Sequence, residues 1–205
     1  MLSHHFDLAI AGGTLVTLSS RMDIIENASI GISGSRIALV DTNHVLAADK
    51  IIDARGGLIL PGLVNTHTHL PMVCFRGLAD DLPLMDWLNH HIFPMETRFV
   101  NRQMVRDGAM LAIAEMILSG TTTCCDGYFF ENQIAEAALA CGMRAVVAQG
   151  FADFATPDYP QYEKMMAAAG RFVERWLPHA PMITPAFFCH SPYTCSPRTL
   201  VNVKA

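Results

Sequence analysis

The sequence lacks long apolar runs and clusters of basic residues. No apolar stretch reaches the roughly 18 residues that span a bilayer, so no transmembrane helix is expected. The first residues show neither the basic nor the apolar region of a signal peptide. The net charge is −5 and no run of Lys or Arg occurs, which argues against nucleic acid as a partner. These absences predict a cytoplasmic protein that binds neither membranes nor nucleic acid.

Charged residues are also scarce, at 16% of 205 residues, whereas hydrophobic residues make up 51%. This amount of core-forming material excludes a disordered chain and indicates a globular one. The six cysteines follow no framework spacing, which favours free thiols in a reducing compartment over a disulfide scaffold.

The pattern of the chain changes near residue 60. Before it, short β-like runs alternate with turn residues such as Gly12-Gly13, Gly34 and Gly56-Gly57, with no room for helices. This pattern predicts a small all-β portion over residues 1–60. The remaining residues, 61–205, show a different alternation and are expected to form a second domain.

Strands and helices alternate after residue 60. Strands are expected at 63–70, 121–126, 144–149 and 182–189, and helices at 101–118, 131–140, 162–176 and from Pro197 onward. Asn101 is the expected cap of the first helix, with Leu111, Ala114, Ile117 and Leu118 along one side. Such alternation implies a parallel sheet with right-handed crossovers. Four units are half of an eight-stranded barrel, which typically needs about 250 residues. We therefore expect either the first half of a barrel or a smaller open sheet.

Two histidines two residues apart, His67 and His69, follow the apolar run that ends at Val64. The run predicts a strand buried on both faces. Because strand side chains alternate, both imidazoles are expected on one side, where they could bind one metal ion. The carboxyl end of a barrel strand is where such enzymes place their chemistry. Because the motif is so short, the alternative is that the two histidines are only polar surface residues of an exposed strand.

Four motifs occur in order along the chain: LPGLVNTHTH at 60–69, FRGLADDLPLMDWL at 75–88, PME at 94–96 and HSPYTCS at 190–196. Together they closely resemble the amidohydrolase superfamily, in particular its branch of 5-methylthioadenosine/S-adenosylhomocysteine deaminases and triazine chlorohydrolases. The resemblance implies an α/β fold, a metal-dependent hydrolase TIM (β/α)8 barrel with a small β-sandwich domain, of which this chain carries the N-terminal part.

The resemblance also implies one divalent metal ion, with zinc expected, and His67 and His69 as its first two ligands. Such an ion lowers the pKa of bound water toward neutrality and so makes a nucleophile available. Glu96 matches a substrate-binding residue that contacts ribose hydroxyls, although a solvated helix-end carboxylate is its alternative reading. His190 matches a substrate-binding histidine and, alternatively, a third ligand. Trp87 is a candidate for packing against a flat heterocycle.

The roles of several other residues, inside these motifs and outside them, stay open. Phe75 could also pack against a heterocycle, although helix packing explains it equally well. Asp126 could be structural or catalytic, and Arg76 and Asp80 fit the pattern without a defined role. Gln149 stands where some adenosylhomocysteine deaminases carry an arginine suited to a substrate carboxylate, which favours a neutral small-molecule substrate.

The expected reaction is hydrolytic deamination of an aminated purine-like heterocycle or nucleoside. Dechlorination of a triazine is the alternative, because the same activated water could displace either leaving group. The catalytic acid and base, a Glu and an Asp, and the remaining metal ligands are expected beyond residue 205. A polypeptide of these 205 residues alone is therefore expected to be inactive, and a non-catalytic fragment that needs a partner chain stays open. Homo-oligomers are common in such families.

Overall fold

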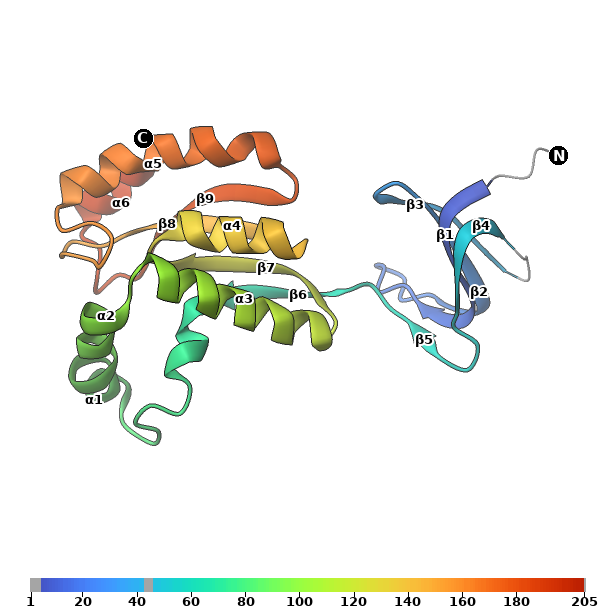
Figure 1. Cartoon of the computed structure of the whole chain (residues 1–205), viewed down its shortest axis with the longest axis horizontal. Coiled ribbons are helices and arrows are strands. Elements are labelled where there is room, and N and C mark those ends of the chain that lie inside the picture. Colours follow the sequence, from blue (N-terminus) through green and yellow to red (C-terminus); the bar gives the residue numbers. More distant parts are fainter. Residues whose placement is uncertain (1–4, 43–45, 205) are drawn as a thin grey trace. The chain divides into compact units, whose positions relative to one another are not determined.

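The computed structural model describes residues 5–42 and 46–204, so the first residues, on which the signal-peptide reading depends, lie partly outside it. The chain divides into two compact units, Met1–Pro61 and Gly62–Ala205 (Figure 1). Across the described ranges, no helix is long and apolar enough to cross a membrane.

The first unit is a sheet without helices in its described part. Its strands are β1 (His5–Val16), β2 (Ile24–Ser33), β3 (Arg36–Thr42), β4 (Ala47–Asp53) and β5 (Leu58–Ile59). The order is β3-β2-β1-β4, with β5 also paired to β1. Strands β2 and β3 run antiparallel to their neighbours, whereas β4 and β5 run parallel to β1. Gly31 is required in β2, because an added Cβ would lie 2.7 Å from the ring of Phe6.

The second unit contains a parallel sheet with strands in sequence order. Its members are β6 (Leu63–Thr68), β7 (Thr121–Tyr128), β8 (Arg144–Phe151) and β9 (Ile183–Cys189). The four strands expected from the sequence are therefore present and parallel. A strand followed by a helix is the repeating unit of a (β/α)8 barrel, and the described part of the chain contains four such units.

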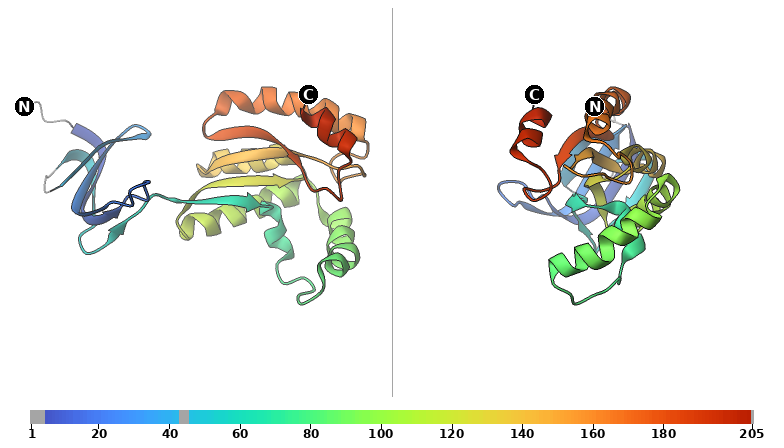
Figure 2. Two further views of the ribbon diagram at one scale, coloured as in Figure 1. Left: turned by 180° about the vertical axis from the view of Figure 1, so that it is seen from behind. Right: turned by 90° about the vertical axis from the view of Figure 1, so that its left-hand side faces the viewer.

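Helices connect these strands: α3 (Arg102–Leu118), α4 (Glu131–Cys141), α5 (Tyr162–Trp176) with the short η3 (Leu177–His179), and α6 (Pro197–Lys204) after the last strand. Helices α3 and α4 cover one face of the sheet, and the view from behind shows its other face (Figure 2). Asn101 caps α3 as predicted, since its side chain accepts hydrogen bonds from the backbone N–H groups of Gln103 and Met104.

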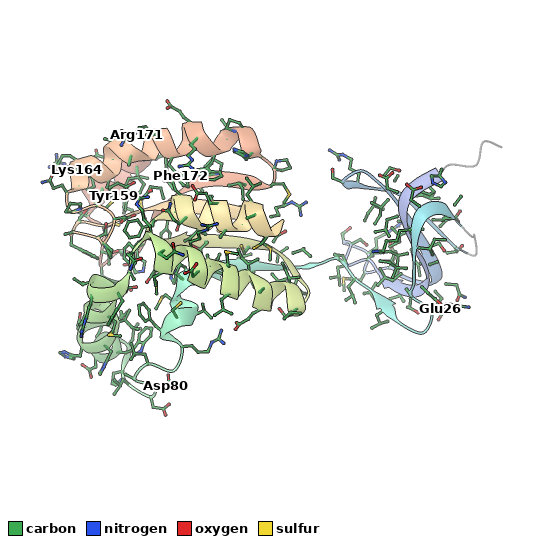
Figure 3. The ribbon with its side chains drawn as sticks, in the orientation of Figure 1. Glu26, Asp80, Tyr159, Lys164, Arg171 and Phe172 are labelled. Atoms are coloured by element: carbon green, nitrogen blue, oxygen red, sulfur yellow. The ribbon has the colours of Figure 1, made fainter. Side chains whose placement is uncertain are left out.

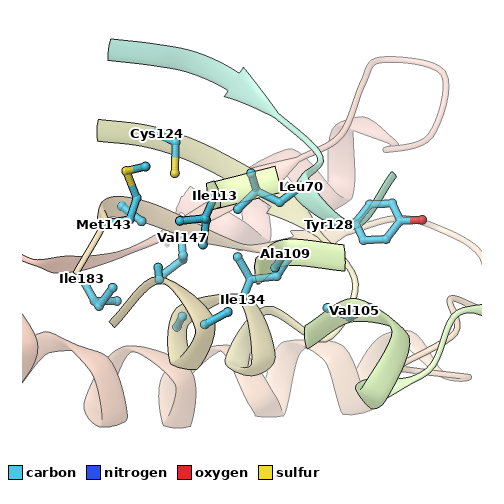
Figure 4. Packing of buried hydrophobic residues seen from close by; sticks show 14 of the residues in the cluster. Leu70, Val105, Ala109, Ile113, Cys124, Tyr128, Ile134, Met143, Val147 and Ile183 are labelled. Atoms are coloured by element: carbon cyan, nitrogen blue, oxygen red, sulfur yellow. The ribbon is translucent and has the colours of Figure 1, made fainter. Parts of the chain in front are cut away.

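The buried side of α3 differs from the expected one. Val105, Ala109 and Ile113 pack into the core between α3, α4 and the sheet (Figure 4), whereas Ile117 and Leu118 are exposed, as is Leu111. The side of α3 that carries small residues, Gly108 and Ala109, faces inward because η1 (Leu70–Phe75) packs tightly against it. An added Cβ at Gly108 would lie 3.0 Å from Pro71.

The prediction that the His67 strand is buried on both faces is wrong for this chain. Leu63 and Val64 in β6 are 56% and 59% exposed. The reason is its place in the sheet: within the described part of the chain β6 pairs only with β7, so it lies at an edge. The close approach of these two strands requires Gly62, where an added Cβ would lie 2.2 Å from Thr122.

Short helices that the sequence reasoning did not anticipate lie between β6 and α3. Besides η1 they are α1 (Leu84–Trp87), η2 (Leu88–Ile92) and α2 (Phe93–Phe99). Turn η2 is π-helical: the Phe93 N–H donates to the carbonyl of Leu88, five residues earlier. Pro94 follows and has no N–H to continue the α-helical pattern. The wider turn changes which side chains share a face.

Candidate active site

A cavity of about 220 Å³ lies at the carboxyl ends of β7, β8 and β9, beneath the helical segment α1–α2. Four of the residues selected from the sequence, His69, Trp87, Glu96 and His190, line it together. Most of the remaining lining is apolar and includes Met72, Leu84, Leu88, Ile92, Phe93, Phe129, Phe151, Phe154 and Phe188. His67 is not among the residues that line the cavity.

His67 and His69 lie close to each other at the end of β6. Their ring centroids are 5.3 Å apart and the rings are nearly perpendicular. His67 is exposed, whereas His69 is half-buried and lies in contact range of the Tyr128 ring, with 6.0 Å between centroids. Burial lowers the pKa of His69, and the nearby His67 lowers it further, against the opposing effect of the hydrogen bond to Gly127. The neutral imidazole favoured in this way is the form that binds metal.

The hydrogen bonding of His69 fits the role of a metal ligand. Its Nδ1 lies 2.5 Å from the carbonyl oxygen of Gly127, an acceptor, so Nδ1 carries the proton. Nε2 then keeps its lone pair available, the arrangement typical of ligating histidines. Gly127 has no side chain for a further reason: an added Cβ would lie 2.7 Å from the Phe188 ring.

The metal site is incomplete within this part of the chain. No group of three His, Cys, Asp or Glu side chains in the described ranges is placed to hold a metal ion. The ring centroid of His190 is 6.2 Å from that of His69, and its role as a substrate-binding histidine or a third ligand stays a prediction. The two imidazoles fit two positions of a zinc coordination sphere, which needs further ligands.

Glu96 is buried in the pocket wall rather than solvated at a helix end. Only 7% of it is exposed. The hydroxyl of Tyr128, at the end of β7, donates to Glu96 Oε1 at 2.8 Å. Burial raises the pKa of Glu96, and the hydrogen bond from Tyr128 lowers it in part. The pocket thus contains one carboxyl group that is already oriented by a neighbour.

Trp87 presents an apolar ring to the pocket because its polar atom is used elsewhere. Its indole Nε1–H donates to the carbonyl of Leu78 at 2.9 Å, in the loop after η1. A flat aromatic face with a satisfied N–H suits packing against a heterocycle. The loop between η1 and α1 also carries Asp80, which points outward (Figure 3) and does not line the pocket.

His190 follows β9 and lies among aromatic rings. The centroids of Phe188 and Tyr193 are 5.6 Å and 6.0 Å from its own. Its Nδ1 is 3.2 Å from the hydroxyl oxygen of Thr194. Burial and the two nearby histidines, His69 and His67, lower the pKa of His190. A neutral imidazole in the pocket can donate or accept one hydrogen bond to a bound ring.

Asp126 has a structural environment beneath the site. It is 1% exposed, and its Oδ1 accepts hydrogen bonds from the Thr68 hydroxyl at 2.7 Å and the Leu70 N–H at 2.6 Å. These two partners flank His69 in sequence. Asp126 therefore holds the chain on both sides of the candidate ligand and does not line the pocket.

Three other residues that the sequence analysis considered also lie away from the pocket. Phe75 packs against the core cluster, and Arg76 forms an ion pair with Glu115 at 2.6 Å. Gln149 is 2% exposed, and its Nε2 donates to the carbonyl of Gly150 at 3.2 Å. Since Gln149 is absent from the pocket lining, an inference about substrate charge must come from the lining residues themselves.

Sequence reasoning missed Tyr128 and the carbonyl of Gly127. Tyr128 stands two residues beyond the end of the strand expected at 121–126, and in the structure β7 continues to it. The signal that could have found it was position, because residues at the carboxyl end of a barrel strand face the site. The Gly127 carbonyl carries no side-chain signal at all.

A family model described as "Amidohydrolase family" matches residues 58–205, and the chain therefore belongs to the amidohydrolase family. Its fold is α/β, with the first four parallel strands of the TIM barrel that the family adopts.

The named relatives are deaminases. The chain is 46% identical to a 5-methylthioadenosine/S-adenosylhomocysteine deaminase from Syntrophobacter fumaroxidans, over 98% of this chain and 47% of the relative. It is 37% identical to a 5'-deoxyadenosine deaminase from Methanococcoides burtonii, over 97% of this chain and 45% of the relative. The chain thus spans about half the length of these curated relatives.

Solved structures show the same similarity. An adenosine deaminase from Xanthomonas campestris with bound zinc superposes with a TM-score of 0.93 at 35% identity, covering 98% of this chain and 46% of that one. An atrazine chlorohydrolase from Arthrobacter aurescens, complexed with zinc, has a TM-score of 0.85 at 21% identity, covering 96% and 49%, which shows a shared fold alone.

Proposed function

We propose that the protein to which this chain belongs hydrolytically deaminates an adenine nucleoside or a related purine-like ring. The observation that carries this proposal is the meeting of His69, Glu96, Trp87 and His190 in one apolar pocket at the carboxyl ends of parallel strands. The names of the relatives, which are deaminases of adenine nucleosides, support it. We also propose a cytoplasmic location, which the six free thiols support.

We propose that His67 and His69 supply two ligands to one divalent metal ion, with zinc expected because the Xanthomonas relative binds it. A bound zinc ion lowers the pKa of coordinated water and so supplies a nucleophile near neutral pH. The chain's own residues act on the substrate: Trp87 packs on the ring, His190 hydrogen-bonds it, and Glu96 accepts from hydroxyl groups. The apolar walls exclude water around the ring.

The lining of the pocket favours a substrate without a charged group at the 5' position. Among the described lining residues Glu96 is the only carboxylate, and no Lys or Arg is present. An amino-acid tail would find no cation to pair with its carboxylate, and burying an unpaired charge is costly. We therefore propose a neutral substrate of the methylthioadenosine or deoxyadenosine type.

The test is ammonia release from methylthioadenosine by the protein at its natural length, with and without zinc. The intact mass of the denatured protein comes first, because it shows whether the tested polypeptide is longer than these 22.5 kDa. Zinc-dependent ammonia release supports the proposal. Chloride release from a chlorotriazine without ammonia release would favour the chlorohydrolase alternative, and neither product would favour a non-catalytic chain. Glu96 argues against a triazine, which has no hydroxyl groups to offer it.

A further inference from the structure

Tyr128 connects the end of β7 to the wall of the pocket. Its ring lies at the margin of the core cluster, and its hydroxyl points away from the aliphatic side chains (Figure 4). That hydroxyl donates to Glu96 Oε1 at 2.8 Å, from a side chain that is only 7% exposed. A hydrogen bond from a neutral donor to a buried carboxylate is among the stronger kinds in proteins.

The contact leaves one oxygen of Glu96 for a ligand. Within the described residues no hydrogen bond reaches Oε2, while Oε1 is held by Tyr128. Because Glu96 lines the pocket, Oε2 is the acceptor that a bound molecule meets. A carboxylate fixed at one oxygen presents the other in a defined direction, which suits a pair of adjacent hydroxyl donors.

The turn after Tyr128 has a strained backbone and is held by hydrogen bonds from two sides. Phe130 adopts a left-handed conformation, with φ of +56°, which is rare for an aromatic residue. Its N–H donates to the buried Asp158 at 2.9 Å, and Glu131 accepts a hydrogen bond from the N–H of Tyr128. Two carboxylates, one in the loop after β8 and one at the start of α4, thus hold the strained turn that follows Tyr128. Strain of this kind persists where the surroundings over-determine a position.

We propose that Tyr128 is a positioning residue that orients Glu96 to recognise the vicinal 2'- and 3'-hydroxyl groups of a ribonucleoside. This inference rests on the proposed deaminase function. It predicts that the loss of the Tyr128 hydroxyl weakens the binding of substrates that carry both hydroxyl groups and leaves the binding of substrates that lack them unchanged.

The experiment compares the wild-type protein at its natural length with Tyr128→Phe, using adenosine and 2',3'-dideoxyadenosine. We expect the variant to raise KM for adenosine about 10-fold or more, the effect of losing a hydrogen bond to a charged group. For dideoxyadenosine the substitution should change KM by less than about twofold. For each substrate, kcat of the variant should be similar to kcat of the wild type, because the contact acts in binding. Tyr162→Phe is the matched control, since its hydroxyl lies 3.4 Å from Asn202 Nδ2 and outside the pocket lining.

Each result decides the matter. A selective rise in KM for adenosine supports the inference, whereas an equal rise for both substrates, or none for adenosine, overturns it. Ammonia release by the wild type separates the two levels: if the wild type deaminates neither substrate, the proposed function fails and takes this inference with it. If Tyr128→Phe does not fold, the double variant Tyr128→Phe/Glu96→Met is tested for folding. Replacing both partners by apolar groups can be nearly neutral, so recovered folding supports the pairing and continued failure overturns it.

Discussion

The carboxyl groups of Asp126, on β7, and Glu131, at the start of α4, lie against each other in the protein interior. Asp126 Oδ2 and Glu131 Oε2 are buried, and no conventional donor in the described residues reaches either. The two side chains interact directly. Burial raises the pKa of Asp126 to about 7, against the hydrogen bonds from Thr68 and Leu70, and burial together with the charge of Asp126 raises that of Glu131. We expect one proton to be held between the two carboxyl groups, where it would satisfy both oxygens.

This pair makes folding stability depend on pH. Unfolded carboxyl groups titrate near pH 4, so between about pH 4 and 7 the folded state retains protons that the unfolded state loses. The free energy of unfolding therefore falls as pH rises through this interval. Asp126→Asn should flatten the dependence of stability on pH, because an amide does not titrate. The amide oxygen still accepts from Thr68 and Leu70, and its NH2 group adds a donor toward Glu131, so the fold is kept. Urea unfolding at pH 5 and 7.5 measures it.

The matched control variant is Asp107→Asn, because Asp107 is an exposed acid on α3. Asp126→Ala removes the acceptor for two hydrogen bonds and should cost about 2–4 kcal/mol of stability. An unaltered pH slope in Asp126→Asn would show that no proton is shared.

His69→Ala should abolish high-affinity zinc binding. Losing an outer-sphere partner of a ligand typically costs about 10–100-fold in metal affinity, and losing the ligand itself should cost at least about 100-fold. Zinc content after dialysis against a competing chelator measures the effect. His5→Ala is the control, because its side chain pairs with Asp49 in the first unit. Full zinc retention in His69→Ala would remove this residue from the metal site.

Trp87 should report ligand binding by its fluorescence. The sequence contains two tryptophans, and Trp176 is buried in the core with its Nε1 bonded to Asn132 at 2.9 Å. Adenosine should therefore quench the wild type and Trp176→Phe but leave Trp87→Phe unchanged. Trp87→Ala should raise KM by about 10-fold from the lost ring contact. Quenching that survives in Trp87→Phe would place the heterocycle elsewhere.

Substrate charge provides a further prediction. With no cationic residue in the described pocket lining, kcat/KM should be at least about 10-fold higher for methylthioadenosine than for S-adenosylhomocysteine, which carries an amino-acid group. Steady-state ammonia release with both substrates decides this. Equal kcat/KM values for the two substrates would mean that residues outside the described part of the chain bind the charged tail.

Much of the fold followed from the sequence because strands and helices after residue 60 alternate with clear periodicity. Glu96 and Trp87 were selected from motifs, but their shared wall depends on the π-helical turn at 88–92, which no simple periodicity reveals. The exposure of β6 could not be predicted either, because it depends on which strands flank it and not on its own apolar residues. Gln149 was selected because some adenosylhomocysteine deaminases carry an arginine at its place, and it is buried away from the pocket.

The hydrogen bond from His69 to Gly127 joins two adjacent strands, since β6 pairs with β7 with Thr68 opposite Asp126. A slip of one residue between these strands would bring a different carbonyl opposite the imidazole and turn neighbouring side chains to the other face. The ring would then lose the partner that sets its tautomer. A chain with this shifted register would consequently bind zinc poorly, so zinc uptake would report that β6 and β7 are correctly paired.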